Sequence, residues 1–392
     1  MAVADPHRCV VRYVRTAAAS AGGLLLACAA VAAPVPSGAP STTPATAPGD
    51  DHGPSLGTLI ERLSESGAYF DTDNLISNER SFVRVVDDLR PAGGVYLGVG
   101  PEQNFNYIAR RRPEWAFIVD IRRDNMVQLL LLVAILVEAE TPEQYLRLLL
   151  SLPPGEGHAD VAGGGPVDPI GRIDAVAPRR DLLERHLAGF EARIAGWGVR
   201  LGEDDRRHLR LVLEQFQEQR LDLRFRSHGR GFAGRYPTYR ELLTAKTPSG
   251  EPASFLMRPE DYRFVRELAL TGRLVPIVGD FSGPRALRSL GDFVRSRELE
   301  VTTFYTSNVE YYLIPTGRFA AFAANVASLP LDPDGLFVRA CFDYGRSHPL
   351  LLPGHRSVTV LQRFADFREL VLRKPTLSDW ELCTERLWTA EH

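Results

Sequence analysis

Cysteine is scarce in this chain, and neither sign of charge is in clear excess. Four cysteines among 392 residues are too few for a disulfide scaffold. Lys+Arg 46 against Asp+Glu 49 leaves a formal net charge of -3, which argues against a globally basic nucleic-acid-binding protein. Hydrophobic residues make up 44% and charged residues 24%, so a mostly disordered or collagen-like chain is excluded. We therefore expect one large globular domain or two ordinary ones, with no nucleic acid as partner.

Several signatures of catalytic chemistry are also missing. The nine histidines are scattered without a pair at metal-ligand spacing, and there is no CxxC, so we expect no metal site. No Walker A sequence occurs. Residues 279–283 place Ser282 one position away from that of a GxSxG nucleophile elbow. Residues 126–137 are apolar except for Gln128 but cover only about half a membrane span, which predicts a core helix.

The start of the chain has the composition of an export signal. Three arginines precede residues 16–33, which carry no charge, and Ala30-Val31-Ala32 offers a small-x-small cleavage site. We expect residues 1–33 to be a signal peptide and the protein to be periplasmic or secreted. Two alternatives stay open: an uncleaved anchor, and a lipoprotein acylated at Cys28, which would be the protein's contact with the membrane.

A polar, Pro- and Ala-rich stretch follows the signal. Residues 34–49 lack charged and aromatic groups, and we expect residues 34–56 to form a flexible linker. Cys341 and Cys383 are the cysteines left in the mature part of the chain. Spacing alone does not decide whether they pair.

From residue 57 onward, short apolar runs alternate with amphipathic segments. Runs of this kind, three of them closed by glycine or an acid, predict buried strands; they cover residues 95–100, 115–120, 274–279, 301–306, 335–342 and 357–364. An insertion of about residues 140–252 is expected to be mainly helical, with amphipathic helices at 181–195 and 203–219. This alternation predicts a single α/β domain over residues 57–392, built on a doubly wound, Rossmann-like sheet.

A glycine turn and an acid mark the first two predicted strands. The first strand ends in Gly98-Val99-Gly100, and the second ends in Asp120 about twenty residues later. Glycines let a backbone turn approach a ligand, and such an acid can accept hydrogen bonds from ribose hydroxyls. Gln103 replaces the third glycine of GxGxxG, which favours a smaller adenosyl ligand over a dinucleotide. The alternative is a tight turn and helix cap without any ligand.

These residues resemble the S-adenosylmethionine site of class I methyltransferases. The resemblance implies that Gly98 and Gly100 line the methionine and ribose, and that Asp120 holds the ribose hydroxyls. It also implies that Asp280, after the third strand, faces the adenine amine. Asn308 and Glu310 follow the fourth strand, where such enzymes place residues that face the acceptor. The segment is not Asn-Pro-Pro-Tyr, so the acceptor stays open.

Three segments also resemble an uncharacterised family of bacterial proteins with this fold: residues 70–79, 95–125 and 304–313. The polar turn at residues 71–74, with Asn78 and Glu79, is either a lid that contacts the ligand or acceptor, or a set of helix caps. The basic, aromatic stretch at residues 220–240 is either a mouth for an anionic acceptor or a surface loop whose arginines pair with neighbouring acids.

The functional prediction is an exported methyltransferase-like protein. It would bind S-adenosylmethionine or a related nucleoside ligand and transfer methyl to an unknown small-molecule or protein acceptor, with a general base removing the acceptor's proton. Because S-adenosylmethionine is made in the cytosol, an exported enzyme would lack an obvious supply. The alternative is therefore a non-catalytic binding module of the cell envelope on the same scaffold.

Overall fold

The computed structural model describes residues 55–155, 168–227, 236–374 and 376–390. The predicted signal peptide, with Cys28, and nearly all of the predicted linker lie outside the described residues. The last two residues of that predicted linker belong to the fold instead. Ser55 caps the first helix, α1 (Leu56–Leu63), by accepting a hydrogen bond from the Thr58 amide, and Leu56 is the first residue of that helix.

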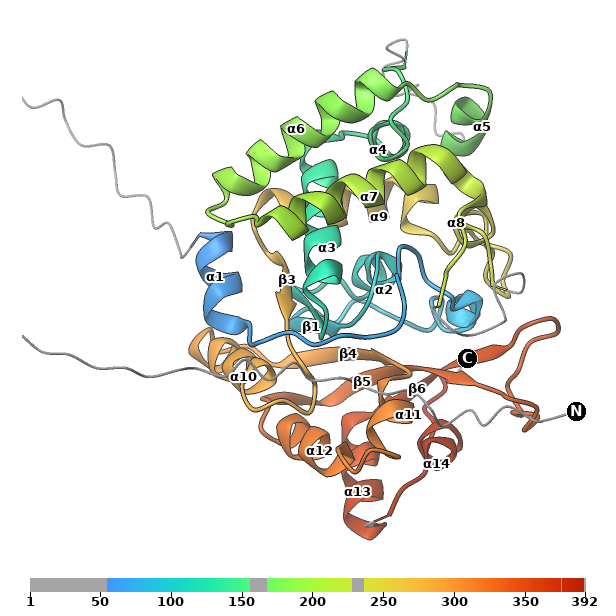
Figure 1. The fold of residues 1–392 in the computed structure, drawn as a ribbon. Coiled ribbons are helices and arrows are strands. Elements are labelled where there is room, and N and C mark those ends of the chain that lie inside the picture. The colour runs from blue at the N-terminus through green and yellow to red at the C-terminus, as the bar shows by residue number, and fades with distance from the viewer. Residues whose placement is uncertain (1–54, 156–167, 228–235, 375, 391–392) are drawn as a thin grey trace, which may run out of the picture.

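A six-stranded sheet forms the centre of the molecule (Figure 1). Its order is β3-β2-β1-β4-β5-β6, and every neighbouring pair is parallel except β5 and β6. The strands are β1 (Val95–Gly98), β2 (Trp115–Asp120), β3 (Leu274–Val278), β4 (Val301–Ser307), β5 (Leu331–Phe342) and β6 (Ser357–Arg363). All six predicted strands are confirmed to within about four residues at their ends. The order is that of a Rossmann-like sheet with one antiparallel edge strand.

The composition of each strand fits its place in the sheet. β1 and β2 are short apolar runs that are buried along nearly their whole length, as expected where helices cover a parallel sheet. β4 is buried except at its last residue, and the longer β5 is buried from residue 335 to residue 341. Pro276 lies within β3 and has no amide hydrogen to donate to a neighbour. This is tolerated because β3 is an edge strand.

Helices cover both faces of the sheet (Figure 1). One face is covered by α2 (Gln103–Arg111), α3 (Arg123–Glu138) and α9 (Pro259–Leu270). The other carries α10 (Ala286–Ser296), α12 (Phe319–Ala327) and α13 (Phe364–Arg373). Short elements connect these layers: η1 (Arg80–Arg84), η4 (Phe255–Met257), α11 (Val309–Leu313) and α14 (Asp379–Thr384). Residues 81–89 form the rest of the short 3₁₀ helix η1 and a following turn.

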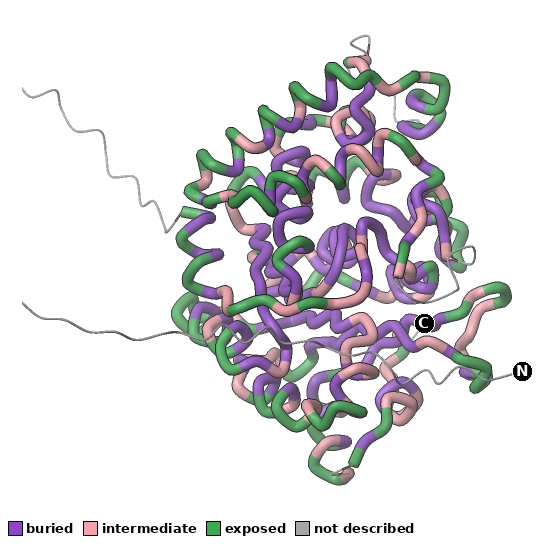
Figure 2. The backbone as a smooth tube through the Cα atoms, in the orientation of Figure 1, coloured by how far each residue is buried: buried purple, intermediate pink, exposed green. Residues whose placement is uncertain are grey.

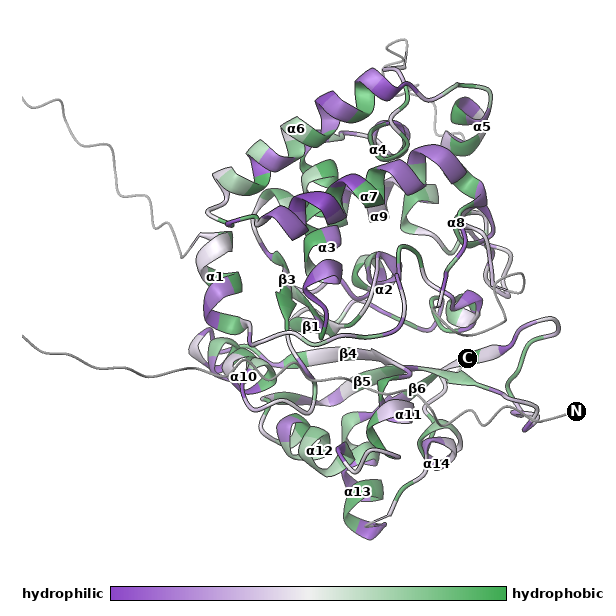
Figure 3. Ribbon diagram, viewed as in Figure 1, coloured by the Kyte–Doolittle hydropathy of each residue, from purple (hydrophilic) through white to green (hydrophobic). Residues whose placement is uncertain are grey.

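The predicted insertion lies between β2 and β3 and is helical in its described part. It contains α4 (Pro142–Leu149), α5 (Pro169–Asp174), α6 (Arg180–Gly196), α7 (Glu203–Gln219), η2 (Arg220–Asp222) and α8 (Tyr239–Leu243). Helices α6 and α7 pack on α3, which is why α3 is apolar and buried on nearly all sides (Figure 2). Their outward faces are hydrophilic (Figure 3). Both predicted amphipathic helices are confirmed.

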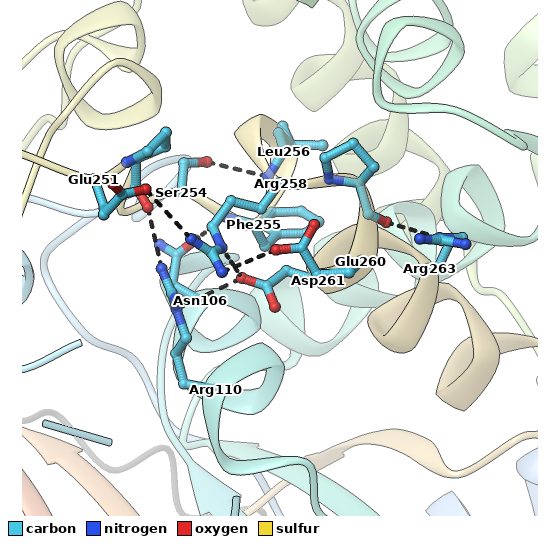
Figure 4. A network of polar contacts seen from close by, with 12 residues as sticks. Asn106, Arg110, Glu251, Ser254, Phe255, Leu256, Arg258, Glu260, Asp261 and Arg263 are labelled. Carbon is cyan, nitrogen blue, oxygen red and sulfur yellow. Dashed lines mark hydrogen bonds and ion pairs between the residues drawn. The ribbon is translucent and has the colours of Figure 1, made fainter. Parts of the chain in front are cut away.

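An ion-pair network joins the segment that follows the insertion to α2 (Figure 4). The buried carboxylate of Asp261 on α9 contacts Arg258 at 2.9 Å, Arg112 at 2.5 Å and Arg110 at 3.5 Å. Nearby, the Asn106 side chain accepts a hydrogen bond from the Phe255 amide at 2.8 Å. The network therefore joins α2, η4 and α9.

A disulfide joins the two cysteines whose pairing the sequence left open. Cys341 on β5 and Cys383 on α14 are bonded, with Cα atoms 5.9 Å apart. The bond fixes the C-terminal helix to the antiparallel end of the sheet. Among the described residues, no helix has both the length and the apolar character to cross a membrane.

Candidate functional site

A cavity of about 1140 Å³ lies at the carboxyl ends of the parallel strands. Ligands of open α/β sheets bind at this edge, where the strand order reverses, here between β1 and β4. The loops after β1, β2 and β3 form what we call the β1–β3 half of the cavity. The loop after β4, the connection from β5 to β6 and residues 70–80 form the β4–β6 half.

The first glycine of the predicted turn serves packing within the protein. A Cβ on Gly98 would lie 1.9 Å from the Asn104 side-chain oxygen, and Gly98 is not among the residues that line the cavity. Asn104 donates to the carbonyl oxygens of Val99 at 2.9 Å and Pro101 at 2.7 Å, and accepts from the Tyr96 hydroxyl at 2.9 Å. The prediction that Gly98 contacts a cofactor is therefore corrected: α2 fills that space with an amide.

The second glycine does face the cavity. Gly100 has a φ of +80°, a left-handed conformation that favours glycine, and a Cβ there would approach only the Asn74 side chain, at 3.9 Å. Its carbonyl oxygen accepts a hydrogen bond from Asn125 at 3.1 Å, which anchors the turn to α3. The absence of a side chain on Gly100 thus leaves space in the cavity next to Asn74.

Asp120 lines the cavity at the end of β2, but a neighbouring arginine already binds it. Arg122 donates to Oδ1 from its backbone amide at 2.9 Å and from Nε at 3.1 Å, and to Oδ2 from its guanidinium at 3.2 Å. A carboxylate has about four acceptor positions. Asp120 therefore keeps about one of them, on Oδ2, for a ligand.

Asp280 lines the cavity after β3 and is also paired. Burial raises the pKa of this carboxyl, but hydrogen bonds from Arg318 and Ser282 outweigh burial, so its pKa is lowered and it stays ionised. Glu65, from the segment after α1, accepts hydrogen bonds from the backbone amides of Asp280 at 2.8 Å and Arg285 at 2.9 Å. The start of α10 is thereby capped from within the chain.

Residues 70–80 pass along the cavity and are held there from below. Arg122 donates to the Thr72 carbonyl oxygen at 2.7 Å, and Gln128 on α3 donates to those of Asn74 at 3.2 Å and Leu75 at 3.1 Å. Of the two interpretations of this segment, the structure favours the one in which it contacts the cleft: Asp71, Thr72, Asn74, Ser77, Asn78 and Glu79 all line the cavity.

Glu79 is the most unusual polar group of the cavity. It is 2% exposed, accepts a hydrogen bond from the Tyr305 hydroxyl at 2.7 Å and another from the Ser307 hydroxyl. Burial raises the pKa of Glu79 from its ordinary value to about 7, although these two hydrogen bonds lower it in part. A carboxyl with this pKa can both take and give a proton near neutral pH.

Packing against β6 fixes the position of Glu79. The Ser81 hydroxyl lies 2.9 Å from those of Ser357 and Thr359 on β6, and Arg84 donates to the Thr359 carbonyl oxygen at 3.2 Å. Because η1 begins directly after Glu79, these contacts hold the carboxyl against the end of β4.

The structure separates the two residues predicted to face the acceptor after β4. Asn308 lines the cavity, next to Ser307. Glu310 does not; it is buried beneath and forms an ion pair with Arg339 on β5 at 2.9 Å, and it accepts from Thr306 at 3.0 Å. The predicted catalytic role of Glu310 is therefore corrected to that of an internal ion pair that fixes the β4–α11 loop.

The basic stretch at residues 220–240 is described only in part, and its arginines that are described have partners within the chain. Arg240 pairs with Asp174 at 2.7 Å, Arg220 donates to the Ile173 carbonyl oxygen at 2.7 Å, and Arg226 donates to Gln219 at 2.9 Å. Arg224 lines the cavity and also donates to the Tyr236 carbonyl oxygen. These contacts favour the surface-loop interpretation for most of the stretch.

Sequence reasoning missed the partners of the site more than the site itself. Six of the eight predicted residues line one cavity: Asn78, Glu79, Gly100, Asp120, Asp280 and Asn308. Tyr305, Ser307 and Arg122 were not predicted. An arginine two residues after the acid that closes β2 is a signal for Arg122, whereas no local pattern indicates that Tyr305 and Ser307 meet Glu79. Within the described part of the chain, no three His, Cys, Asp or Glu side chains gather as a metal ion would require.

The fold and the cavity define an α/β protein with a Rossmann-like sheet and a small-molecule-sized cleft at its switch point. The chain belongs to the family of a domain of unknown function, DUF7790, whose model matches residues 74–151 and 202–385. The matched ranges contain all six predicted residues that line the cavity and leave out α1, α5 and α6. No curated protein matches the chain significantly.

Proposed function

We propose that the cavity binds a nucleoside-bearing ligand, with S-adenosylmethionine as the first candidate, and that the protein transfers its methyl group to an acceptor held nearby. The supporting observation is that Gly100, Asp120 and Asp280, from three successive strand ends, line the same cavity as Glu79. A volume of about 1140 Å³ is sufficient for a nucleoside ligand together with a small acceptor.

The residues of the β1–β3 half fit such a ligand in a restricted way. The remaining acceptor position on Asp120 can take one ribose hydroxyl, and the open side of Gly100 allows close approach of the ligand. Bound S-adenosylmethionine would supply an activated methyl group. The chain's own contribution is to position the acceptor and to hold its proton on Glu79.

The disulfide between Cys341 and Cys383 supports the proposal that the protein is exported, to the periplasm or beyond. Disulfides persist mainly in oxidising compartments. Fractionation of the producing cells tests this part: the protein should lie outside the cytosol and lack residues 1–33, and a full-length cytosolic protein would contradict it.

Calorimetric titration of the purified protein with S-adenosylmethionine and S-adenosylhomocysteine tests ligand binding. We expect micromolar affinity for both, lowered at least about tenfold by Asp120→Asn, which keeps the shape of the side chain and leaves the amide oxygen as its one side-chain acceptor. Thermal unfolding checks that the variant is folded. Absence of binding by the folded wild-type protein, or unchanged affinity in Asp120→Asn, contradicts the proposal.

The second candidate is a non-catalytic binding module, favoured by one specific observation. The space beside Gly98 holds the Asn104 side chain. Arg122 donates to most acceptor positions of Asp120. Both groups expected to bind a nucleoside are therefore largely engaged within the protein. A folded protein that binds neither probe in the titration would favour this alternative.

A further inference from the structure

Four aromatic side chains form a connected wall in the β4–β6 half of the cavity: Phe70, Tyr311, Tyr312 and Tyr344. Phe70 meets Tyr312 edge-on with ring centroids 5.0 Å apart, and Tyr312 meets Tyr311 edge-on at 5.2 Å. Tyr344 stacks on Tyr311 at 5.5 Å with an interplanar angle of 26°, and it is 58% exposed. Aromatic faces of this kind bind the faces of other rings.

Three residues of the cavity lining hold a left-handed backbone conformation although none is glycine. Asn74, Ser307 and Tyr344 have φ values of +46°, +54° and +46°, and they belong to three separate segments. Such a conformation is unfavourable for residues other than glycine and persists where the surrounding structure over-determines it, commonly at ligand sites. Here the conformation of Ser307 places its hydroxyl on Glu79, and that of Tyr344 places its ring on the aromatic wall.

Two polar groups beside the wall, on Glu79 and Asn78, suit a hydroxyl-bearing molecule. Each oxygen of Glu79 accepts one hydrogen bond, from Tyr305 or from Ser307, and keeps a second lone pair. The Asn78 side chain lines the same part of the cavity and has no hydrogen-bond partner among the described residues. Its amide can therefore donate to and accept from a further hydroxyl.

The chemistry of Glu79 discriminates among classes of acceptor. A carboxylate acceptor would be repelled by ionised Glu79, and an ammonium beside it would be stabilised in its protonated, unreactive form. A thiol ionises near pH 8.5 without assistance. A hydroxyl group requires a base to remove its proton as it reacts.

We propose that the β4–β6 half holds the acceptor as a ring that bears a hydroxyl group, stacked on the aromatic wall, with Glu79 as the general base. This inference rests on the proposed function. In the step, the acceptor oxygen forms a bond to the methyl carbon while the methyl–sulfur bond breaks, its electron pair stays on sulfur, and the hydroxyl proton passes to Glu79. The catalytic residue is Glu79; Tyr305 and Ser307 are positioning residues.

Ring binding is tested apart from transfer by calorimetry with four probes. Catechol and methyl glucoside carry ring hydroxyls of phenolic and sugar type, while benzylamine and benzoate carry an amine and a carboxylate. We expect one or both hydroxyl probes to bind and the other two to bind at least about tenfold more weakly. Tyr344→Ala should weaken binding about tenfold, whereas Tyr69→Ala should not, because Tyr69 is similarly exposed at 54% but lies outside the cavity lining.

The base is tested with a matched pair of buried carboxyls. Glu102 is also buried, accepts a tyrosine hydroxyl (Tyr145 at 2.9 Å) and has its pKa raised by burial to about 7, but it does not line the cavity. With S-adenosylmethionine and the better hydroxyl probe, Glu79→Gln should slow transfer more than about hundredfold and remove the pH dependence near 7, with unchanged affinity for S-adenosylmethionine. Glu102→Gln should keep the wild-type pH profile and a rate within about twofold.

Each contrary result has one meaning. Preferred binding or methylation of benzylamine or benzoate overturns the acceptor class. Undiminished transfer in Glu79→Gln overturns the base. If S-adenosylmethionine binds while neither hydroxyl probe binds or is methylated, the inference fails and the proposed function stands. If S-adenosylmethionine does not bind to the folded protein, the proposed function itself fails.

Discussion

The two halves of the cavity differ in how far contacts within the protein engage their polar groups. In the β1–β3 half, each predicted group except Gly100 is engaged by a neighbour in the chain: Gly98 by Asn104, Asp120 by Arg122 and Asp280 by Arg318. In the β4–β6 half, Glu79 accepts two hydrogen bonds and keeps a lone pair on each oxygen, beside the aromatic wall.

The difference teaches that a residue type at the expected strand end does not establish its role. A carboxylate at the end of β2 is suited to ribose only to the extent that its acceptor positions are free. Glu79 and Glu102 give the same lesson for proton transfer. Burial raises the pKa of both carboxyls to about 7, yet only Glu79 lines the cavity. A shifted pKa marks a site only together with access.

The largest effect is expected from breaking the Asp120–Arg122 pair. Arg122→Met should leave a buried carboxylate without its cation and cost about 3–5 kcal/mol of unfolding free energy. It would also free Asp120 for a ligand. Urea unfolding measures the first effect, and Arg200→Met, at an exposed and weakly paired arginine, is the control. A loss below about 1 kcal/mol would show that the pair does not occupy Asp120 as described.

Substitution of the two glycines of the turn should also separate an internal residue from one that lines the cavity, with the larger loss of unfolding free energy at the internal one. Gly98→Ala forces a Cβ against the Asn104 side chain and the Tyr96 ring, and should cost about 3 kcal/mol. Gly100→Ala meets open space, so its cost is that of the left-handed backbone alone, about 1 kcal/mol. Denaturant unfolding of the two variants provides the measurement. Equal losses of unfolding free energy would contradict the assignment of Gly98 to internal packing and of Gly100 to the cavity lining.

The raised pKa values predict a pH dependence of stability. Between about pH 4.5 and 7 the folded protein keeps protons on Glu79 and Glu102 that the unfolded chain releases, so these groups lower stability as the pH rises. Each contributes up to about 1.4 kcal/mol per pH unit. The difference in unfolding free energy between wild type and either glutamine variant should therefore change across this window. A constant difference from pH 5 to 7 would contradict the raised pKa.

The smallest effect is expected from removing one tyrosine hydroxyl. Tyr305→Phe deletes a hydrogen bond to Glu79, and Tyr145→Phe deletes one to Glu102, each at about 1 kcal/mol of stability. Both hydrogen bonds lower the carboxyl pKa, so each variant should raise it. Only Tyr305→Phe should move the pH profile of activity, and toward higher pH. A shift caused by Tyr145→Phe instead would show that Glu102, and not Glu79, holds the transferred proton.

The fold was predictable because its signals are local and repeated. Short apolar runs, three of them closed by glycine or an acid, predicted all six strands, and helical spacing predicted α6 and α7. The direction of single side chains was less predictable. Asn308 and Glu310 are two residues apart where α11 begins, and a helix turns about 100° per residue, so the two side chains point in different directions.

Contacts between distant segments lie beyond any local pattern. Glu79 meets Tyr305 and Ser307 across more than 220 residues, and Asn104 reaches back to fill the turn beside Gly98. The disulfide between Cys341 and Cys383 spans 42 residues in sequence, and spacing left it open. Such pairings depend on tertiary packing, which is why the candidate residues were identified more readily than their partners.

A structure of the protein grown with S-adenosylhomocysteine tests the central claim most directly. The account predicts the nucleoside in the cavity, with one ribose hydroxyl on Asp120 Oδ2, the Asp120–Arg122 pair intact and the sulfur directed toward Glu79. A ligand bound elsewhere, or an unoccupied cavity at saturating ligand, would contradict it.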